Sequence, residues 1–294
     1  MQIFPDCIPC ILQVSFSAIR RVTEDLDEQK GLLKEVLKIP PLKGEQWNVT
    51  SSEVVERVFE IISTHSGNKD PYRADKKRLN ESLLELYQEF RDLVHSSDDP
   101  CLTAVKLSIL GNSMDAMVND NPVELVQVLQ QKARNMSLPQ DTYAELEKTL
   151  KSANTVIVFG DNAGEIVLDK LFIETLRERY SIDFIYVVRN EPTLTDVTHD
   201  DARAVGMDEV ATVIENGIVG PLPGTILERC SPQIRRLVKD ADLIVSKGGG
   251  NFDTLSEATI GYKPCFFLLT SKCRVYCSQF STSMNQPIVH HMLL

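Results

Sequence analysis

The spacing of apolar residues predicts helices throughout the first hundred residues. Three sets recur every three or four positions with polar residues between them, as in helices with one buried face. They are Ile8, Leu12, Phe16 and Ile19; Val54, Val55, Val58 and Ile62; and Leu79, Leu83, Leu86, Phe90 and Leu93. The pair Pro40-Pro41 and the stretch 66–71 separate these helices. Asp98-Asp99-Pro100 then predicts the start of a further helix, which ends near Gly111.

The pattern changes near residue 150, where short apolar runs begin to alternate with helical stretches. The runs cover residues 155–159, 184–188, 210–214, 243–245 and 265–269, and one helical stretch contains Leu227, Cys230, Ile234 and Leu237. The runs are continuously apolar, which is typical of strands buried on both faces of a parallel sheet. We predict an α/β protein: a three-layer α/β/α domain, Rossmann-like with a mainly parallel sheet, at residues 99–294, and an all-helical domain at residues 1–98.

Composition narrows the class of protein. The chain has 294 residues, 43% of them apolar and 25% charged, which is ordinary for a soluble globular protein. Its net charge of −11 argues against a general nucleic-acid surface. The apolar runs are too short to span a membrane, and the N-terminus lacks a signal-peptide pattern. Seven cysteines are a poor disulfide framework, so we expect a reducing, cytoplasmic location. The oligomeric state cannot be read from the sequence.

Polar side chains follow four of the predicted strands. Asp161-Asn162-Ala163-Gly164-Glu165 follows the first, and Arg189-Asn190-Glu191 with Asp196 follows the second. Ser246-Lys247-Gly248-Gly249-Gly250-Asn251 and Thr270-Ser271-Lys272-Cys273 follow two later strands. Because the carboxyl ends of parallel strands meet at one edge of a sheet, we expect these segments to form one site.

The side chains at this edge suit a divalent cation and a phosphate. Asp161, Asn162 and Asp196 supply carboxylate and amide oxygens, which suit a hard divalent ion that keeps open positions for water and substrate. Lys272 supplies a compact positive charge for a phosphate oxygen. Backbone N–H groups at residues 163–165 and 248–250 are further candidate donors. The sequence therefore predicts metal-assisted chemistry on a small phosphorylated metabolite.

Each of these features also has an ordinary structural explanation. Asp161 and Asn162 are common types of helix cap. Asp196, Asp200 and Asp201 taken alone are typical of solvated loop acids. The three consecutive glycines are also explained by a flexible turn, and they match neither the nucleotide-binding nor the dinucleotide-binding pattern. Only their occurrence together favours a site.

Seven blocks in the chain resemble the metal-dependent damage-control phosphatases, a family long catalogued as a domain of unknown function. The blocks are Cys7-Ile8-Pro9-Cys10; Asp98-Asp99-Pro100 with Thr103-Ala104-Val105; Gly111-Asn112 with Asp115; Asp161 to Glu165; Asp196-Val197-Thr198 with Asp201-Ala202; Lys247-Gly248 with Asn251-Phe252; and Phe267 to Cys273. The first block resembles the archaeal and bacterial branch with an N-terminal C-x-x-C. The Asp-Asn-Ala-Gly-Glu block is the most specific, and the blocks span nearly the whole chain.

The resemblance implies a site between the two domains and hydrolysis of phosphomonoesters, especially sugar phosphates and damaged or side-product phosphometabolites. It implies one divalent ion (Mn²⁺, Co²⁺, Ni²⁺ or Mg²⁺) on Asp161, Asn162 and Asp196, which we also take as the catalytic residues. It implies that Asn112 and Lys272 help to hold the phosphate. We include Glu165, Lys247 and Asn251 as further candidates for phosphate binding.

Two cysteine pairs and a histidine pair allow several roles. Cys7 and Cys10 open the first predicted helix, where its dipole favours a thiolate. They are a redox pair, buried structural side chains, or part of a four-cysteine metal site completed by Cys273 and Cys277. We expect His290-His291 to lie in a frayed tail.

Two other functions fit the same residues. A non-catalytic sensor of a phosphorylated metabolite would use the same pocket, and ligand-linked stabilisation without turnover would distinguish it. A small-molecule methyltransferase would need a glycine-rich turn after the first strand, where Asp161-Asn162 stands instead. An aspartyl-phosphate intermediate is not expected, because the chain lacks an Asp-x-Asp pair at that position.

Overall fold

The computed structural model describes residues 1–112 and 122–294. Its helices in the N-terminal half are α1 (Cys7–Val22), α2 (Leu26–Val36), η1 (Pro40–Lys43), α3 (Ser51–Ser66), α4 (Arg73–Leu84), α5 (Tyr87–His95), α6 (Pro100–Gly111), α7 (Pro122–Asn135) and α8 (Gln140–Ser152). The strands are β1 (Thr155–Phe159), β2 (Asp183–Val188), β3 (Thr212–Glu215), β4 (Leu243–Lys247), β5 (Pro264–Thr270) and β6 (Pro287–Leu293). Between the strands lie α9 (Glu165–Arg179), α10 (His199–Ala204), η3 (Met207–Glu209), η4 (Leu227–Arg229), α11 (Pro232–Asp240), α12 (Gly248–Leu255) and α13 (Arg274–Gln279).

The strands form one sheet in the order β3-β2-β1-β4-β5-β6. Strands β1 to β5 are parallel to their neighbours, and β6 is antiparallel to β5. The predicted α/β class and mainly parallel sheet are therefore confirmed. The chain leaves β1 toward β2 and β3 and later returns to the other side of β1 as β4. This reversal between β1 and β4 is the position where open parallel sheets bind ligands.

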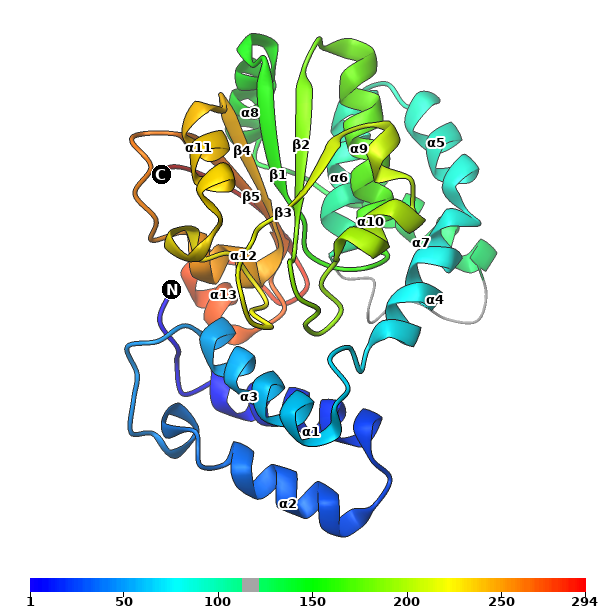
Figure 1. Ribbon diagram of the computed structural model, residues 1–294. Coiled ribbons are helices and arrows are strands. Elements are labelled where there is room, and N and C mark those ends of the chain that lie inside the picture. The colour runs from blue at the N-terminus through cyan, green and yellow to red at the C-terminus, as the bar shows by residue number, and fades with distance from the viewer. Residues whose placement is uncertain (113–121) are drawn as a thin grey trace.

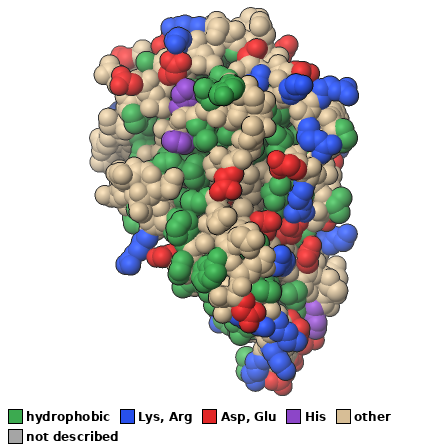
Figure 2. All heavy atoms as spheres, turned by 90° about the vertical axis from the view of Figure 1, so that its left-hand side faces the viewer, with side chains coloured by type: hydrophobic (Ala, Val, Ile, Leu, Met, Phe, Trp, Pro, Cys, Tyr) green, Lys and Arg blue, Asp and Glu red, His purple; other side chains and the backbone are tan. Residues whose placement is uncertain are grey.

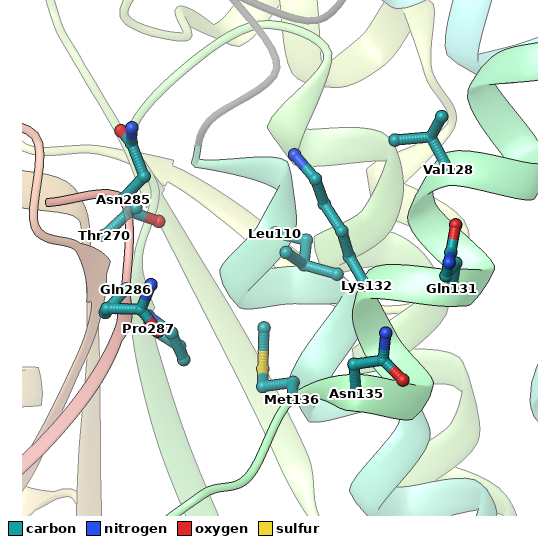
Figure 3. A pocket seen from close by; sticks show the side chains of 10 residues that line it. All are labelled: Leu110, Val128, Gln131, Lys132, Asn135, Met136, Thr270, Asn285, Gln286 and Pro287. Carbon is teal, nitrogen blue, oxygen red and sulfur yellow. The ribbon is translucent and has the colours of Figure 1, made fainter. Parts of the chain in front are cut away.

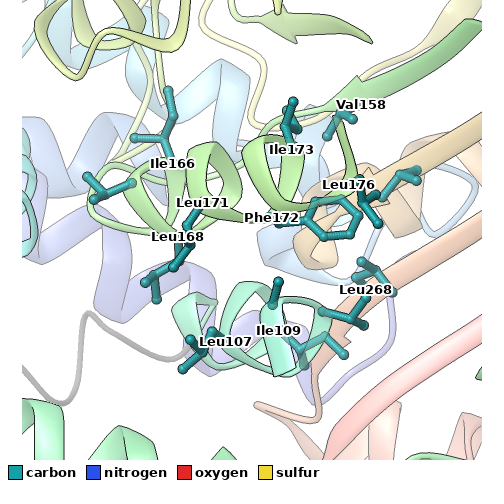
Figure 4. Close-up of a cluster of buried hydrophobic side chains, with 14 of the residues drawn as sticks. Leu107, Ile109, Val158, Ile166, Leu168, Leu171, Phe172, Ile173, Leu176 and Leu268 are labelled. Carbon is teal, nitrogen blue, oxygen red and sulfur yellow. The ribbon is translucent and has the colours of Figure 1, made fainter. Parts of the chain in front are cut away.

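Alternate residues of each strand enter two separate hydrophobic cores. Val156 and Val158 of β1 face the core formed with α6 and α9, and Figure 4 shows Val158 beside Phe172 and Leu176. Ile157 and Phe159 of β1 face the core formed with α11 and α12. Every residue of β4 is buried, as are all but the first residues of β1 and β2. Burial on both faces explains the continuous apolar runs.

The first three helices form a separate unit beneath the carboxyl ends of the strands (Figure 1). Helices α1, α2 and α3 pack on one another around their own cluster of buried side chains, which extends to Tyr72. From Leu79 onward the buried side chains of α4 and α5 belong to the core that α9 shares with the sheet. The domain boundary at residue 98 stays a prediction, and the change of core lies between Tyr72 and Leu79.

Two predicted helices are interrupted by turns. The stripe from Leu79 to Leu93 forms α4 and α5, because the backbone turns at Glu85 and Leu86 while Leu86 stays buried. The stretch from Leu227 to Leu237 forms η4 and α11, because Ser231 caps a new helix that starts at Pro232. The spacing of apolar residues can continue across a short turn, so it does not show where one helix ends and the next begins.

Two segments near the site and the C-terminus differ from expectation. The three glycines are the first turn of helix α12. His290 and His291, predicted to lie in a frayed tail, belong to β6 and pair with Phe267 and Phe266 of β5. Strand β6 escaped notice because its histidines interrupt the apolar run, whereas the pairing with β5 supplies its stability.

Polar contacts join the helical unit and α4 to the sheet domain. Glu56 of α3 accepts two hydrogen bonds from Arg229, at 2.8 and 2.5 Å. Ser51 donates to the Asp253 carboxylate at 2.6 Å, and Lys76 of α4 pairs with Asp201 at 3.0 Å. These links fix the helices over the sheet edge.

Two further observations concern partners. In the described part of the chain, none of the helices is both long enough and apolar enough to cross a membrane. On the face shown in Figure 2, lysine and arginine side chains are scattered among acidic and neutral ones. The absence of nucleic-acid partners stays a prediction.

Candidate functional site

The strand ends that carry polar side chains meet at the reversal between β1 and β4. Residues 161–163, which follow β1, pair with residues 195–197 through a short antiparallel bridge. In this bridge the Val197 N–H donates to Asp161 O, and the Ala163 N–H donates to Thr195 O, both at 2.8 Å. The bridge brings the segments of Asp161 and Asp196 side by side, so this pair of predicted residues is placed together.

Arg189, at the end of β2, lies between the two aspartates. Its Nε donates to Asp196 Oδ2 at 2.7 Å, and its Nη2 is 3.7 Å from Asp161 Oδ1. Its Nη1 donates to Thr225 and to Asn251 Oδ1, each at 3.0 Å. Arg189 is 1% exposed, so these contacts take place away from bulk water. Burial raises the pKa of Asp196, and Arg189 opposes that rise.

Asp161 is surrounded by amide donors and further carboxylates. Its Oδ2 accepts hydrogen bonds from Asn162 Nδ2 at 2.6 Å and Asn112 Nδ2 at 3.1 Å. Burial raises the pKa of Asp161 well above its usual range, and the charges of Asp196 and Glu165 raise it further. Arg189 and Lys272 act in the opposite direction. At Asp161, burial and the neighbouring carboxylates therefore outweigh the two cations.

A second buried cluster lies directly behind Asp161. Lys247 Nζ, at the end of β4, contacts Asp169 Oδ1 at 2.6 Å, Glu165 Oε1 at 2.7 Å and Ser108 O at 2.8 Å. Lys247, Glu165 and Asp169 are all 0% exposed. Asn112 Nδ2 also donates to Glu165 Oε2 at 3.0 Å, which joins this cluster to Asp161.

The charges of these two clusters fit a divalent cation. Four buried carboxylates belong to them, and the two buried cations that pair with them are Arg189 and Lys247. With all four carboxylates ionised, these described groups have a formal excess of two negative charges, and burying uncompensated charge is costly. The carboxylates are those of Asp161, Glu165, Asp169 and Asp196. A divalent ion on the exposed side of Asp161 and Asp196 would balance the excess, and their oxygen ligands suit such an ion.

The Asn162 side chain would have to change its orientation to bind a metal ion. Asn162 Oδ1 accepts a hydrogen bond from Thr195 Oγ1 at 2.7 Å, while its Nδ2 faces Asp161. Coordination through Oδ1 therefore needs the amide to turn over, after which Thr195 Oγ1 can accept from Nδ2. Within the residues described, no three side chains of His, Cys, Asp or Glu are arranged as a metal site. The predicted set has two carboxylates and one amide, so water and substrate would complete the coordination.

The remaining predicted residues have different surroundings. Asn251 donates to Gly160 O and Lys247 O and accepts from Arg189 and Thr225, so it ties the ends of β1 and β4 together. A phosphate could contact Asn251 or Lys247 only by displacing one of these partners. Asn112 Oδ1 accepts from the Thr270 N–H at 3.2 Å, which links the end of β5 to Asp161. Lys272, which follows β5, is exposed.

Two of the possibilities considered for the helix starts are not found in the structure. Asp161 and Asn162 do not cap α9, whose N-cap is Gly164. Two of the backbone donors expected for phosphate are also taken: Ala163 N by Thr195 O, and Gly164 N by Asn80 Oδ1 at 2.7 Å. Helix α12 remains the candidate helix start for an anion.

Gly248, the first residue of α12, is required by its contact with Asp161. It has a φ of +76°, and a Cβ there would lie 1.8 Å from Asp161 Oδ2. The backbone of β4 thus reaches the carboxylate that follows β1. This close approach explains why a residue without a Cβ occupies position 248, so the glycine run is more than a flexible turn.

A cavity of about 580 Å³ opens onto these groups. Its walls include Asp161, Asn162, Asp196 and Lys272 from the sheet edge. Helices α1, α3 and α4 supply the opposite wall, as the family resemblance implies for a site between the domains. Its volume lies within the range of small-molecule sites, roughly 300–1,000 Å³.

A second cavity of about 580 Å³ lies between α6, α7 and the β5–β6 edge (Figure 3). Lys132 is the charged side chain among its described lining residues, and Thr270 lines both cavities. The carboxylates that could hold a cation line the first cavity, which is therefore the candidate site.

Sequence reasoning missed several groups of the site. Arg189 was noted after its strand but not assigned a role, and Asp169, Ser108 and Lys76 were not considered. Their types gave little signal, since Asp169 and Ser108 lie within helices and become important only through burial. Asp115, which was part of the family resemblance, lies outside the described residues.

Three of the cysteines, Cys7, Cys10 and Cys273, lie close to one another. Cys7 begins α1, Cys10 lines the cavity, and Cys273 caps α13. Burial raises the pKa of the Cys7 thiol, and Asp253, Cys273 and Cys10 raise it further, so the expected stabilisation of a thiolate is not found. All seven cysteines are free. The four-cysteine site has no counterpart among the described residues, and the redox role stays a prediction.

Comparison with known proteins identifies the family. A family model for the damage-control phosphatase ARMT1-like domain matches residues 3–286. The chain belongs to this family. Among similar proteins, a damage-control phosphatase of Archaeoglobus fulgidus is 33% identical over 283 residues, which cover 93% of each chain. An uncharacterized protein of Methanocaldococcus jannaschii is 31% identical, over 93% of this chain and 90% of that protein.

Pyrococcus horikoshii supplies a further relative and a solved structure. Its damage-control phosphatase is 26% identical, over 93% of this chain and 92% of that one. The crystal structure of a DUF89 family protein from the same organism superposes with a TM-score of 0.88 over 98% of each chain, at 24% identity. This likeness shows that the two chains share one fold over nearly their whole length.

Proposed function

We propose that this member of the ARMT1-like family is a metal-dependent phosphatase that hydrolyses phosphomonoesters of small metabolites, in metabolite damage control. The observation that carries the proposal is the set of four buried carboxylates that share two buried cations at the sheet edge, beside a cavity of metabolite size. The names of the archaeal relatives support phosphatase chemistry. Sugar phosphates and side-product phosphometabolites are the proposed substrate class.

Asp161, Asn162 and Asp196 would hold the divalent ion, for which Mn²⁺, Co²⁺, Ni²⁺ and Mg²⁺ are the candidates. When bound, such an ion polarises a phosphoryl oxygen and lowers the pKa of water. Arg189 keeps Asp161 and Asp196 in place from behind, through its contacts at 3.7 and 2.7 Å. Lys247 holds Glu165 in the same way. These cations limit the repulsion between the carboxylates.

The substrate phosphate would lie between Lys272 and the first turn of α12. Lys272 and Gly249 both line the cavity, and the N-terminus of a helix favours an anion. The Lys272 ammonium would offset charge that develops on the phosphoryl oxygens and the leaving group. Tyr276 and Leu79 also line the cavity, where they reduce the access of water. The seven free cysteines support the proposed cytoplasmic location.

The test measures release of phosphate from glucose 6-phosphate by the full chain. After treatment with EDTA, activity should be lost, and Mn²⁺ or Co²⁺ should restore it. Asp161→Ala should lower kcat/KM by at least about a hundredfold while circular dichroism stays native. The control is Asp240→Ala, an exposed aspartate at the end of α11. Equal turnover by Asp161→Ala and the control would exclude this site.

The sensor alternative gives a different result in the same preparations. Thermal unfolding with Mn²⁺ and glucose 6-phosphate would show stabilisation by ligand, but no phosphate would be released. The methyltransferase alternative finds no support at the first strand end, since Asp161 stands where a glycine-rich turn is needed.

A further inference from the structure

The cavity has a second charged wall, which is formed by helices and not by the sheet edge that carries the carboxylates of the proposed metal site. Arg21, at the end of α1, and Asp75 and Arg78, in α4, all line the cavity. Asp161, Asp196 and Lys272 line it from the sheet edge. The two charged walls belong to different parts of the fold, since α1 is in the helical unit and α4 connects it to the sheet domain.

The two arginines share a single carboxylate. Arg21 Nε and Nη2 contact Asp75 Oδ2 at 3.0 and 2.9 Å, while Arg78 Nη2 is 3.3 Å from Asp75 Oδ1. The three side chains therefore carry one positive charge in excess. We call Arg21 and Arg78, together with the Asp75 carboxylate that bridges them, the arginine pair.

The two members of the arginine pair are held to different extents. Arg21 Nη1 also donates to Ser17 O and Ser17 Oγ, and the guanidinium lies 4.2 Å from the centre of the Tyr72 ring. Arg78 makes an ion pair with Asp75 alone among the described residues, and 71% of its side chain is exposed. Arg21 thus fixes Asp75, and Arg78 keeps donors for a ligand.

Apolar residues lie on the same cavity surface as the arginine pair. Val14, Val55, Tyr72 and Leu79 line it, all from the helical unit or α4. A volume of about 580 Å³ accommodates a ligand with two ends, one at the sheet edge and one at the arginine pair.

We propose that the preferred substrates carry a second anionic group, a carboxylate or a second phosphate, and that Arg78 binds this group on the wall opposite the proposed metal site. The inference rests on the proposed phosphatase function and adds a substrate class to it. Guanidinium groups suit both anions because their N–H donors match pairs of oxygens. Asp75 limits the strength of this binding, since it neutralises one of the two arginines.

The experiment compares three substrates that differ at the end remote from a common 6-phosphate. Glucose 6-phosphate has a neutral remote end, 6-phosphogluconate has a carboxylate, and glucose 1,6-bisphosphate has a second phosphate. With Mn²⁺ present, the wild type should show kcat/KM values about tenfold higher for one or both of the latter two. The measured quantity is the kcat/KM of each of these two compounds divided by that of glucose 6-phosphate. Comparing the two ratios shows whether the site prefers a carboxylate or a phosphate.

Two variants should change this ratio in opposite directions. Arg78→Gln removes the charge and should lower the ratio about tenfold. Asp75→Asn removes the neutralising carboxylate and should raise the ratio several-fold. The control is Lys77→Gln on the neighbouring position of α4, because Lys77 is 74% exposed and is outside the cavity lining. It removes the same charge and should leave the ratio at the wild-type value.

A wild-type ratio near one, or an Arg78→Gln ratio equal to that of Lys77→Gln, would overturn the inference. If the wild type hydrolyses neither these compounds nor p-nitrophenyl phosphate, the proposed function fails instead. Calorimetric binding of the same three compounds then supplies the ratio as dissociation constants. Tighter binding of the two-ended compounds that is lost in Arg78→Gln would still support the arginine pair as an anion site.

Discussion

Replacing Lys247 by methionine tests whether the buried charge cluster behind Asp161 is needed for stability. The ammonium has three acceptors at 2.6 to 2.8 Å, two of them the carboxylates of Asp169 and Glu165. All three ionisable groups are 0% exposed. Methionine has a similar shape, but it leaves the carboxylates without a cation. Removing one partner of a buried ion pair costs about 3–5 kcal/mol, so we expect the free energy of unfolding to fall by that amount.

The assay is urea unfolding at pH 7, followed by far-ultraviolet circular dichroism and by tryptophan fluorescence. Trp47 is the single tryptophan, and it lies in the segment between η1 and α3. Fluorescence therefore reports on the helical unit and circular dichroism on the whole chain. We expect the loss of stability to appear in the transition followed by circular dichroism, because Lys247 lies at the end of β4.

The matched control is Lys148→Met on the surface of α8. Lys148 pairs with Glu145 at 3.2 Å, and its side chain is 77% exposed. Such surface pairs contribute at most about 1 kcal/mol. Equal losses in Lys247→Met and Lys148→Met would refute the reasoning. The double variant Lys247→Met with Asp169→Asn should recover part of the stability, because it removes one of the stranded carboxylates.

The difference in free energy of unfolding between wild type and Lys247→Met should also depend on pH. Burial already raises the pKa of Asp169, and Lys247 opposes that rise, so the variant should raise this pKa further. The folded variant then binds a proton that the unfolded chain, with an aspartate pKa near 3.9, releases. Stability therefore decreases as pH rises through this interval. The deficit relative to wild type should be smaller at pH 5 than at pH 8.

Three further predictions concern the site, the contact between domains and the sheet. Gly248→Ala should lower kcat/KM about a hundredfold in the phosphate-release assay, because the new Cβ would lie 1.8 Å from Asp161 Oδ2 and would push this carboxylate out of place. Activity within threefold of wild type would contradict this contact. Glu56→Gln should reduce the free energy of unfolding by about 1–2 kcal/mol, because the amide keeps one acceptor oxygen and so loses one of the two hydrogen bonds from the partly exposed Arg229; an unchanged urea midpoint would show that this link contributes nothing. Hydrogen bonds from two backbone N–H groups lower the pKa of Asp242, so Asp242→Asn should slightly destabilise the chain at pH 7, and the difference in urea midpoint should disappear as pH falls below about 4.

Much of the fold follows from local patterns in the sequence. The run from Thr155 to Phe159 is a strand with the predicted bounds, because a continuous β-branched run is stable only when both faces are buried. Asp99 caps α6 with a hydrogen bond to the Leu102 N–H, and Pro100 begins that helix, as the Asp-Pro pair predicted. These features depend on residues close together in the chain, so the sequence alone determines them.

The candidate site was predictable only in part. Parallel strands have their carboxyl ends at one edge, so the sequence predicts that the segments of Asp161 and Asp196 lie at one location. Strand order, the reversal between β1 and β4, and the pairing of β6 with β5 depend on contacts between distant residues. Local periodicity carries no information about such contacts.

The charge environment of the site was decided by tertiary structure. Arg189, Lys247 and Asp169 have unremarkable neighbours in the sequence, and each could have been solvated. Folding removes them from water and leaves each able to interact with charges from other strands and helices. Burial also makes Asp196 a partner of Arg189, which excludes the alternative of a solvated loop acid. The sequence by itself determined which residues are available, whereas only the three-dimensional arrangement decided which charges are buried together, because desolvation depends on packing by distant segments.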